Sequence, residues 1–148
     1  MQKKQKHSRN GESIDWDDRR DKYVTAVNDL YQQIKAILAE PIRQKTVSVQ
    51  QRSKQLTENY IGTYSVDDLI LLLGNEQVRF SPRGRNTAGA EGRVDVVGER
   101  SEAMAILQPN AQWGFVQTRQ PNLTVAPFNE ATLAEVLRLT IQARSASE

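Results

Sequence analysis

The sequence predicts an α+β fold, in which an antiparallel β-meander of about six or seven strands is covered by a long N-terminal helix and a C-terminal helix. Three observations lead to this prediction. Apolar residues recur at three- and four-residue spacing near both ends of the chain, they alternate with polar residues through much of the middle, and short turn sequences separate the alternating segments. Because short turns join antiparallel neighbours, we expect the strands to form a meander and the two helices to cover one of its faces.

The first element is a helix expected over residues 15–39. Three aspartates in its first turn favour the positive end of the helix dipole, and Pro41 is expected to end the helix because proline cannot continue the backbone hydrogen bonding. An apolar stripe at helical spacing is typical of a surface that faces the core, and a groove for a cofactor or a partner is the alternative. The stripe consists of Trp16, Tyr23, Val24, Val27, Leu30, Tyr31, Ile34, Ile37 and Leu38.

The middle of the chain is predicted to form short strands. An alternation of apolar and polar residues begins at Val47 and predicts a strand over residues 46–52, a candidate edge of the sheet. Residues 56–63 fit neither a helix nor a strand clearly. The Gly74-Asn75 pair supplies the positive φ angles of a tight turn, so the segments on either side of it are expected to form a hairpin. The further strands are expected over residues 66–73, 76–81, 93–97, 102–107, 112–118 and 123–126.

A last helix and a single domain complete the plan. Asn129 is suited to cap the N-terminus of a helix. A chain of 148 residues matches the usual size of one domain, and no internal repeat or interior linker divides it. We therefore expect a disordered basic tail over residues 1–12 and one α+β domain over residues 13–148. The buried stripe of the last helix is expected to contain Leu133, Val136, Leu137 and Ile141.

The net charge of +2 comes from the tail rather than from the domain. Residues 1–11 contain four of the 20 basic residues and no acid, which leaves 16 basic against 18 acidic residues in the rest of the chain. Such a tail would give weak, salt-sensitive binding to polyanions, and a solvated leader without function is the alternative. The charge of the domain itself gives little reason to expect nucleic-acid binding.

The side chains exclude several reaction classes. The chain has no cysteine, which excludes disulfides and thiolate catalysis and is typical of a reducing compartment. Its one histidine, His7, lies in the expected tail, so a Ser-His-Asp triad and a histidine-rich metal site lack support. No apolar run approaches the roughly 20 residues of a membrane span, and no apolar stretch follows the basic N-terminus as in a secretory signal. We expect a cytoplasmic protein that is not an enzyme and that binds no metal, cofactor or membrane.

An Arg/Gly-rich loop over residues 81–92 is the most unusual feature, and it leads into the strand expected over residues 93–97. Two of its glycines have the spacing of a P-loop, but no Lys-Ser/Thr follows, and the loop leads to a strand instead of a helix. Four nearby guanidinium groups are suited to bind phosphates, nucleic acid or an acidic partner. The alternative is a structural corner in which Arg93 and Asp95, two apart on one strand face, pair with each other. The candidate binding residues are Arg79, Arg83, Arg85 and Arg93, and the candidate structural residues are Gly84, Gly89, Gly92 and Asp95.

Part of this region resembles a nuclease. The segment Gly92-Arg93-Val94-Asp95-Val96-Val97 resembles the Gly-x-x-Asp strand of restriction-type nucleases, which carries their first metal-binding acid. That fold needs a Glu/Asp-x-Lys on the following strand, whereas the last lysine of this chain is Lys54. The resemblance thus implies a degenerate relative of these nucleases. Adjacent acids elsewhere, such as Asp67 and Asp68, are expected to be ordinary surface residues.

A second resemblance covers more of the chain. Pro82-Arg83-Gly84, followed by Gly89-Ala90-Glu91-Gly92-Arg93-Val94-Asp95, a tryptophan strand and a terminal helix, resembles a family of small uncharacterised bacterial proteins. Their pattern is Pro-x-Gly and then Gly-Ala-x-Gly-Arg-Val-Asp. The resemblance implies a bacterial source and a shared α+β fold over about residues 15–141. It implies no activity, so no functional residue is carried over.

Three functions fit these observations. A non-catalytic protein-interaction or assembly subunit explains why no catalytic set is visible, and a protein partner or self-association through an exposed sheet edge is expected for it. A nucleic-acid or phosphate-binding module would use the Arg/Gly loop, residues 79–93, together with the tail. A degenerate restriction-nuclease-like protein is the third. The interaction subunit is the prediction, and the other two are its alternatives.

Overall fold

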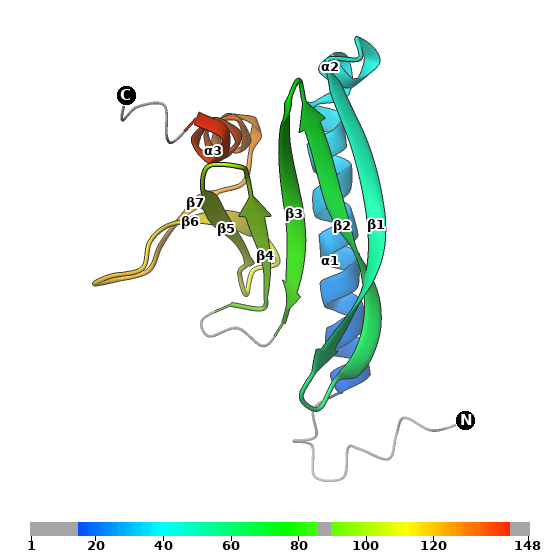
Figure 1. The fold of residues 1–148 in the computed structure, drawn as a ribbon. Helices are drawn as coiled ribbons and strands as arrows, with labels where there is room; N and C mark the ends of the chain where they lie inside the picture. The colour runs from blue at the N-terminus through cyan, green and yellow to red at the C-terminus, as the bar shows by residue number, and fades with distance from the viewer. Residues whose placement is uncertain (1–14, 86–89, 143–148) are drawn as a thin grey trace.

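The computed structural model describes residues 15–85 and 90–142 of the 148-residue chain. Its seven strands form one antiparallel sheet in the order β1-β2-β3-β4-β5-β6-β7, so each strand pairs with its neighbours in the sequence (Figure 1). The predicted α+β meander with an N-terminal and a C-terminal helix is confirmed. The predicted basic tail, residues 1–12, lies outside the described residues.

The elements follow the predicted order, with one extra short helix. They are α1 (Trp16–Ile37), α2 (Ala39–Arg43), β1 (Val47–Glu58), β2 (Gly62–Leu73), β3 (Glu76–Gly84), β4 (Gly92–Val97), β5 (Glu102–Leu107), β6 (Trp113–Thr118), β7 (Thr124–Pro127) and α3 (Glu130–Gln142). In the part of the chain that is described, no helix is long and apolar enough to cross a membrane.

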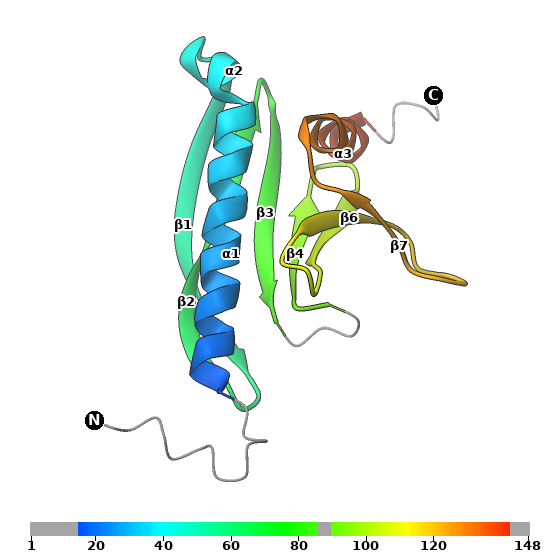
Figure 2. The same ribbon diagram turned by 180° about the vertical axis from the view of Figure 1, so that it is seen from behind.

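Helix α1 begins where its aspartates predict. The side chain of Asp15 accepts a hydrogen bond of 3.0 Å from the backbone N–H of Asp18 and so caps the first turn. The buried residues of α1 lie on one stripe and pack against the sheet, and Figure 2 shows the helix running along β1 to β3. These residues are Tyr23, Val27, Leu30, Tyr31 and Ile34.

The prediction that Pro41 ends this helix was wrong. Helix α1 ends at Ile37 with Leu38 as its cap, and Pro41 lies inside α2. Pro41 is the third residue of α2. Backbone N–H groups in the first turn of a helix have no acceptor within that helix, so the N–H that proline lacks costs little stability at this position. Pro41 therefore belongs to the start of a new helix instead of the end of the old one.

The first hairpin is longer than the sequence predicts. The strand expected over residues 46–52 continues to Glu58, and the unassigned residues 56–63 contain the tip of the β1–β2 hairpin. The two strands pair without a register shift from Val47 opposite Leu73 to Glu58 opposite Gly62. Strand β1 is first and β7 last in the sheet order, so both are edges.

The predicted hairpin at Gly74-Asn75 is confirmed, but its two strands separate halfway along. Strands β2 and β3 pair from the turn as far as Leu69 opposite Phe80. Beyond this point the described part of β2 pairs with β1, and β3 pairs with β4. The sheet thus opens between β2 and β3.

Strand β3 does not end at Ser81, as the sequence predicts, but continues to Gly84. Pro82 pairs with Val94 of β4, and it has no N–H to donate toward the side from which β2 has separated. A register shift between Pro82 and Gly84 leaves Arg83 as the extra residue of a β-bulge. The expected loop is therefore shorter, and Arg83 belongs to a strand.

Both long helices and the sheet share one hydrophobic core. The predicted cap of α3 is confirmed, because the side chain of Asn129 accepts a hydrogen bond of 3.0 Å from the backbone N–H of Thr132. Leu133, Val136 and Leu137 of α3 are buried in the same cluster as the stripe of α1. The sheet face that packs on the helices is therefore the inner face.

Candidate functional site

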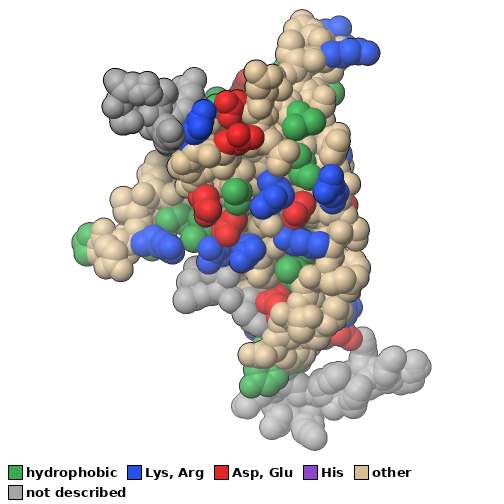
Figure 3. Space-filling view, viewed as in Figure 1, with side chains coloured by type: hydrophobic (Ala, Val, Ile, Leu, Met, Phe, Trp, Pro, Cys, Tyr) green, Lys and Arg blue, Asp and Glu red, His purple; other side chains and the backbone are tan. Residues whose placement is uncertain are grey.

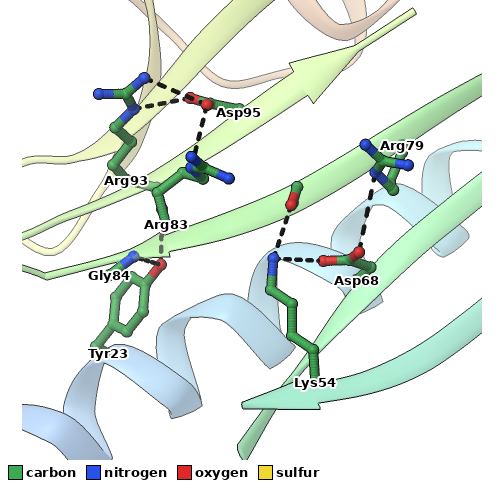
Figure 4. Close-up of polar contacts among 9 residues, drawn as sticks. Tyr23, Lys54, Asp68, Arg79, Arg83, Gly84, Arg93 and Asp95 are labelled. Atoms are coloured by element: carbon green, nitrogen blue, oxygen red, sulfur yellow. Dashed lines mark hydrogen bonds and ion pairs between the residues drawn. The ribbon is translucent and has the colours of Figure 1, made fainter. Parts of the chain in front are cut away.

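Charged side chains gather on the face of the sheet opposite α1, which we call the open face. Alternate residues of each strand point to this face, because neighbouring residues of a strand point to opposite sides. Figure 3 shows basic and acidic side chains in a band across it, and Figure 4 shows how they pair. The open-face cluster consists of Lys54, Asp68, Arg79, Arg83, Arg93 and Asp95.

Asp95 of β4 holds two arginines of this cluster. Its Oδ1 lies 2.7 Å from Nε of Arg93, and its Oδ2 lies 3.2 Å from Nη2 of Arg93 and 3.5 Å from Nε of Arg83. The pair Arg93–Asp95 is thus present, as expected for two residues on one strand face. The side chain of Asp95 is 13% exposed, whereas that of Arg83 is 57% exposed. Arg83 therefore reaches into solvent, with a looser contact to the shared carboxylate than Arg93 has.

Asp68 of β2 holds the other two cations. Its Oδ1 lies 2.8 Å from Nζ of Lys54, and its Oδ2 lies 3.9 Å from Nε of Arg79. Lys54 also donates a hydrogen bond of 2.7 Å to Oγ of Ser81, which joins β1 to β3 where β2 has separated from β3. The side chain of Asp68 is 18% exposed. The expectation that Asp68 is an ordinary surface acid was wrong, because two neighbouring strands bring cations to it.

Arg85 does not belong to the open-face cluster. Its side chain is 10% exposed, and its Nη2 donates a hydrogen bond of 2.9 Å to Oε1 of Glu91. Its backbone N–H donates to the carboxylate of Glu58, 2.9 Å from Oε1. Arg85 and Glu91 line a hollow of about 720 Å³ beside α1 and the β5–β6 turn. Of the four arginines predicted to bind a ligand, three lie together on the open face and Arg85 lies apart from them.

Two glycines of the predicted loop allow the chain to approach Tyr23 of α1 closely. Gly84 has a φ of +115°, which residues with a Cβ rarely adopt, and its N–H donates a hydrogen bond of 3.1 Å to the Tyr23 hydroxyl. That hydroxyl donates in turn to the backbone oxygen of Arg93 at 2.6 Å. A Cβ on Gly92 would lie 2.4 Å from Cδ1 of Tyr23. Gly84 and Gly92 thus have the structural role expected of them, and Gly89 lies outside the described residues.

Three tyrosines around this corner are held in the protonated form. Burial raises the pKa of Tyr23 and of Tyr31, whose hydroxyl donates to the backbone oxygen of Asp67 at 2.7 Å. Burial also raises the pKa of Tyr64, and a hydrogen bond from this hydroxyl to the Glu58 carboxylate raises it further. These hydroxyls therefore act as structural hydrogen-bond donors at neutral pH.

Asp95 is the acid that the nuclease resemblance identifies. Its carboxylate contacts guanidinium groups on both oxygens. Within residues 15–85 and 90–142, no group of three or more His, Cys, Asp or Glu side chains is placed so that it could hold a metal ion. The degenerate nuclease remains a prediction.

Comparison with known proteins finds no match, since no family model, no curated protein and no solved structure is significantly similar to this chain. The resemblance of the Gly-Ala-x-Gly-Arg-Val-Asp segment to small bacterial proteins therefore stays a prediction.

Sequence reasoning missed the half of the cluster around Asp68. Lys54 and Ser81 carry no motif, and Asp68 sits beside another acid in a segment that gives no sign of a nearby cation. One signal was available in the alternation that begins at Val47. If this alternation is extended to Lys54, it places the lysine on one face of an edge strand. Its partner Asp68 can be identified only once the register of the hairpin is known.

Proposed function

We propose that this chain is a non-catalytic interaction subunit that binds an acidic surface of a partner protein through the open-face cluster. The observation that carries the proposal is the charge of that cluster. Four cations, Lys54, Arg79, Arg83 and Arg93, surround two carboxylates, so the cluster has a net charge of +2 although the chain without residues 1–11 carries two more acids than bases. An excess of positive charge in one place favours a negatively charged partner.

Arg93 is already ordered for binding. Arg93 makes two hydrogen bonds to Asp95, and this fixes its guanidinium plane on the sheet face. A side chain that is held in place before association loses less conformational entropy when it binds. Arg83, which is 57% exposed, presents most of its hydrogen-bonding groups to solvent and would make the first contact with a carboxylate.

Neighbouring side chains on the open face favour a protein partner. Met104 is opposite Asp95 in the sheet register, Val97 is opposite Arg79, and both apolar side chains are partly exposed. Arginine and methionine with interspersed apolar surface are enriched at protein interfaces. A strand face that binds single-stranded nucleic acid instead presents aromatic rings to the bases. The aromatic side chains of the described strands are all buried, namely Tyr64, Phe80, Trp113 and Phe115.

A capture experiment with a matched charge change tests the proposal. Tagged wild-type protein is used to retain partners from a lysate of its own organism, in parallel with Arg83→Glu and with Arg138→Glu. Arg138 is on α3 and is 53% exposed, so its substitution changes the net charge equally at a similar exposure but on another surface. We expect a protein that wild type and Arg138→Glu retain, that Arg83→Glu loses, and that elutes with salt. If the three proteins retain the same set, the open face is not the interface.

Binding of nucleic acid or another phosphate ligand is the second candidate. It is favoured by one observation, namely that Arg83 and Arg93 converge on the single carboxylate of Asp95, so a phosphate could accept hydrogen bonds from Arg83 without leaving Asp95 unpaired. Titration of a mixed-sequence oligonucleotide at several salt concentrations tests it. Arg83→Ala should weaken binding and flatten its salt dependence, and a wild-type protein with no affinity at low salt would exclude this candidate.

A further inference from the structure

We infer that the edge strand β1 is a dimerisation surface, at which a second copy of this chain pairs antiparallel with β1 and continues the sheet. This surface shares Lys54 with the open-face cluster, but it consists of the backbone edge of β1 and does not rest on the function proposed for that cluster. Strand β1 runs from Val47 to Glu58 without a bulge, and every residue in it is paired with β2 on one side. Among the described residues, no strand pairs with its other side.

Strand β1 lacks most of the features by which proteins protect an edge. Edge strands are commonly kept short, bulged, interrupted by proline, covered by another element or lined with charged side chains, and of these features β1 has only its charged residues. β1 has 12 residues, contains no proline, and most of its side chains are exposed between Val47 and Glu58. The opposite edge, β7, has four residues and ends at a proline. Of the two edges, β1 is therefore the one that can accept a further strand along a useful length.

The side chains of β1 favour a second copy of the same strand as that partner. Half of its 12 residues are serine, threonine or glutamine, which can hydrogen-bond to the same residue types across a strand pair. Gln51, Gln55 and Thr57 already bond to side chains of β2. Ser48, Gln50 and Ser53 are exposed. Its charged residues are Arg52, Lys54 and Glu58, and Glu58 already contacts the backbone of Arg85. A self-paired edge must therefore keep Arg52 and Lys54 apart from their copies.

This requirement and the length of strand that can pair together select the position of the two-fold axis. When an antiparallel dimer continues a sheet, side chains on the same face lie opposite each other, so the axis passes through a residue of β1. An axis at Arg52, Ser53 or Lys54 places two cations directly opposite each other. Of the axes that avoid this, the one at Gln51 pairs the longest segment of β1, residues 47–55 of both copies. The opposed pairs are Val47 with Gln55, Ser48 with Lys54, Val49 with Ser53, Gln50 with Arg52, and Gln51 with its own copy.

The size of this interface is adequate for a specific dimer. Nine opposed positions give about eight to ten backbone hydrogen bonds between the strands, which is in the range of a typical protein interface. A hollow of about 450 Å³ opens beside the first part of β1, and its lining consists of Lys35, Ala39, Ile42, Arg43 and Val49. A strand paired with β1 would lie next to this hollow and would cover part of its apolar lining.

Light scattering with charge variants tests the dimer in solution. We expect a mass of about 33 kDa, twice the 16.7 kDa of one chain, in the upper part of a concentration series. Gln50 is exposed, and in the dimer Gln50 of each copy faces Arg52 of the other, so this contact occurs twice. Gln50→Glu should therefore lower the dissociation constant of the dimer and Gln50→Lys should raise it, each by roughly 2- to 30-fold. Gln77→Lys, at an exposed position of β3 away from the edge, should leave the dissociation constant unchanged.

Cysteine cross-linking tests the register, and the chain contains no native cysteine to interfere. Gln51→Cys should form a disulfide-linked dimer under mild oxidation, because the two Cα atoms at the axis lie within the roughly 4.4–6.8 Å that a disulfide needs. Ser48→Cys, which faces Lys54 of the second copy, should not cross-link. A single-chain mass at every concentration would overturn the dimer, and a cross-link that is strongest at another β1 position would overturn the axis at Gln51.

Discussion

Replacing Tyr23 by phenylalanine tests whether the contacts of this side chain with Gly84 and Gly92 hold a structural corner together. The substitution keeps the buried ring and removes a hydroxyl that accepts from Gly84 N–H at 3.1 Å and donates to the Arg93 oxygen at 2.6 Å. Leaving a buried polar group unsatisfied costs about 1–3 kcal/mol. Two groups lose a partner here, the Gly84 N–H and the Arg93 oxygen, and the loss is smaller for Arg93 because it lies within β4. We therefore expect the free energy of unfolding to fall by about 2–4 kcal/mol, which combines these two penalties.

Urea denaturation measures this change directly. With an m value of about 2 kcal/mol/M, the expected loss lowers the midpoint by about 1–2 M. Two further Tyr→Phe substitutions serve as controls. Tyr60 is 81% exposed, so Tyr60→Phe should change stability by less than about 0.5 kcal/mol. The Tyr31 hydroxyl donates to Asp67 O at 2.7 Å and also lies 3.2 Å from Phe80 O, so Tyr31→Phe should lie between the other two, at about 1–2 kcal/mol.

The reasoning would be refuted if Tyr23→Phe were as mild as Tyr60→Phe. In that case the hydroxyl bonds to Gly84 and Arg93 would not hold the corner together, and the glycines would need another explanation. Binding measurements on the same variant add a second readout. If the corner positions Arg93, Tyr23→Phe should also weaken the capture of an acidic partner in proportion to the loss of order there.

The remaining predictions concern the same corner and the charged face. Gly92→Ala should destabilise the protein by about 1–3 kcal/mol in urea denaturation, because the added Cβ would meet the ring of Tyr23 at 2.4 Å; an unchanged midpoint would show that the helix can shift without loss. The pKa values of Tyr23, Tyr31 and Tyr64 are raised in the folded state, so on raising the pH the unfolded state loses these protons first. The free energy of unfolding should therefore keep this contribution below about pH 10 and fall above it by up to about 1.4 kcal/mol per pH unit for each tyrosine. Thermal denaturation from pH 8 to 11 checks this, and a flat profile would contradict it. Asp95→Asn raises the net charge of the open-face cluster from +2 to +3 and frees its arginines, so binding of an acidic partner should tighten and become more salt-dependent while stability falls by about 1 kcal/mol. Weaker binding by Asp95→Asn would mean that Asp95 positions the arginines more than it neutralises them.

Local signals were sufficient to predict most of the fold. The cap at Asn129 and the turn at Gly74 were identified correctly because each depends on the chemistry of a few consecutive residues. The errors arose where the outcome depends on distant segments. Residues 56–63 become a hairpin tip because β1 and β2 pair over their whole length, and β3 extends past Ser81 because β4 supplies a partner there.

The candidate site was predictable to the same extent. Arg93 and Asp95 pair within one strand, and the spacing of two already places them on one face. Lys54 and Asp68 approach each other through the register of a hairpin whose tip the sequence did not reveal. Arg85 is buried through Glu91 and Glu58, and the position of Glu58 depends on that same hairpin.

The contacts of α1 have a consequence for how the chain folds as it is synthesised. The strands of the meander pair with their sequence neighbours, and each pair can form as soon as its second strand is made. Helix α1 emerges first, yet Tyr23 bonds to Arg93, 70 residues later, and the backbone oxygen of Ala26 accepts from the indole of Trp113, 87 residues later. At a synthesis rate of about 5–20 residues per second, the part of α1 around Tyr23 and Ala26 waits roughly 4–17 s for these partners. The nascent helix is thus the segment for which a chaperone, or premature association with another chain, competes with native folding.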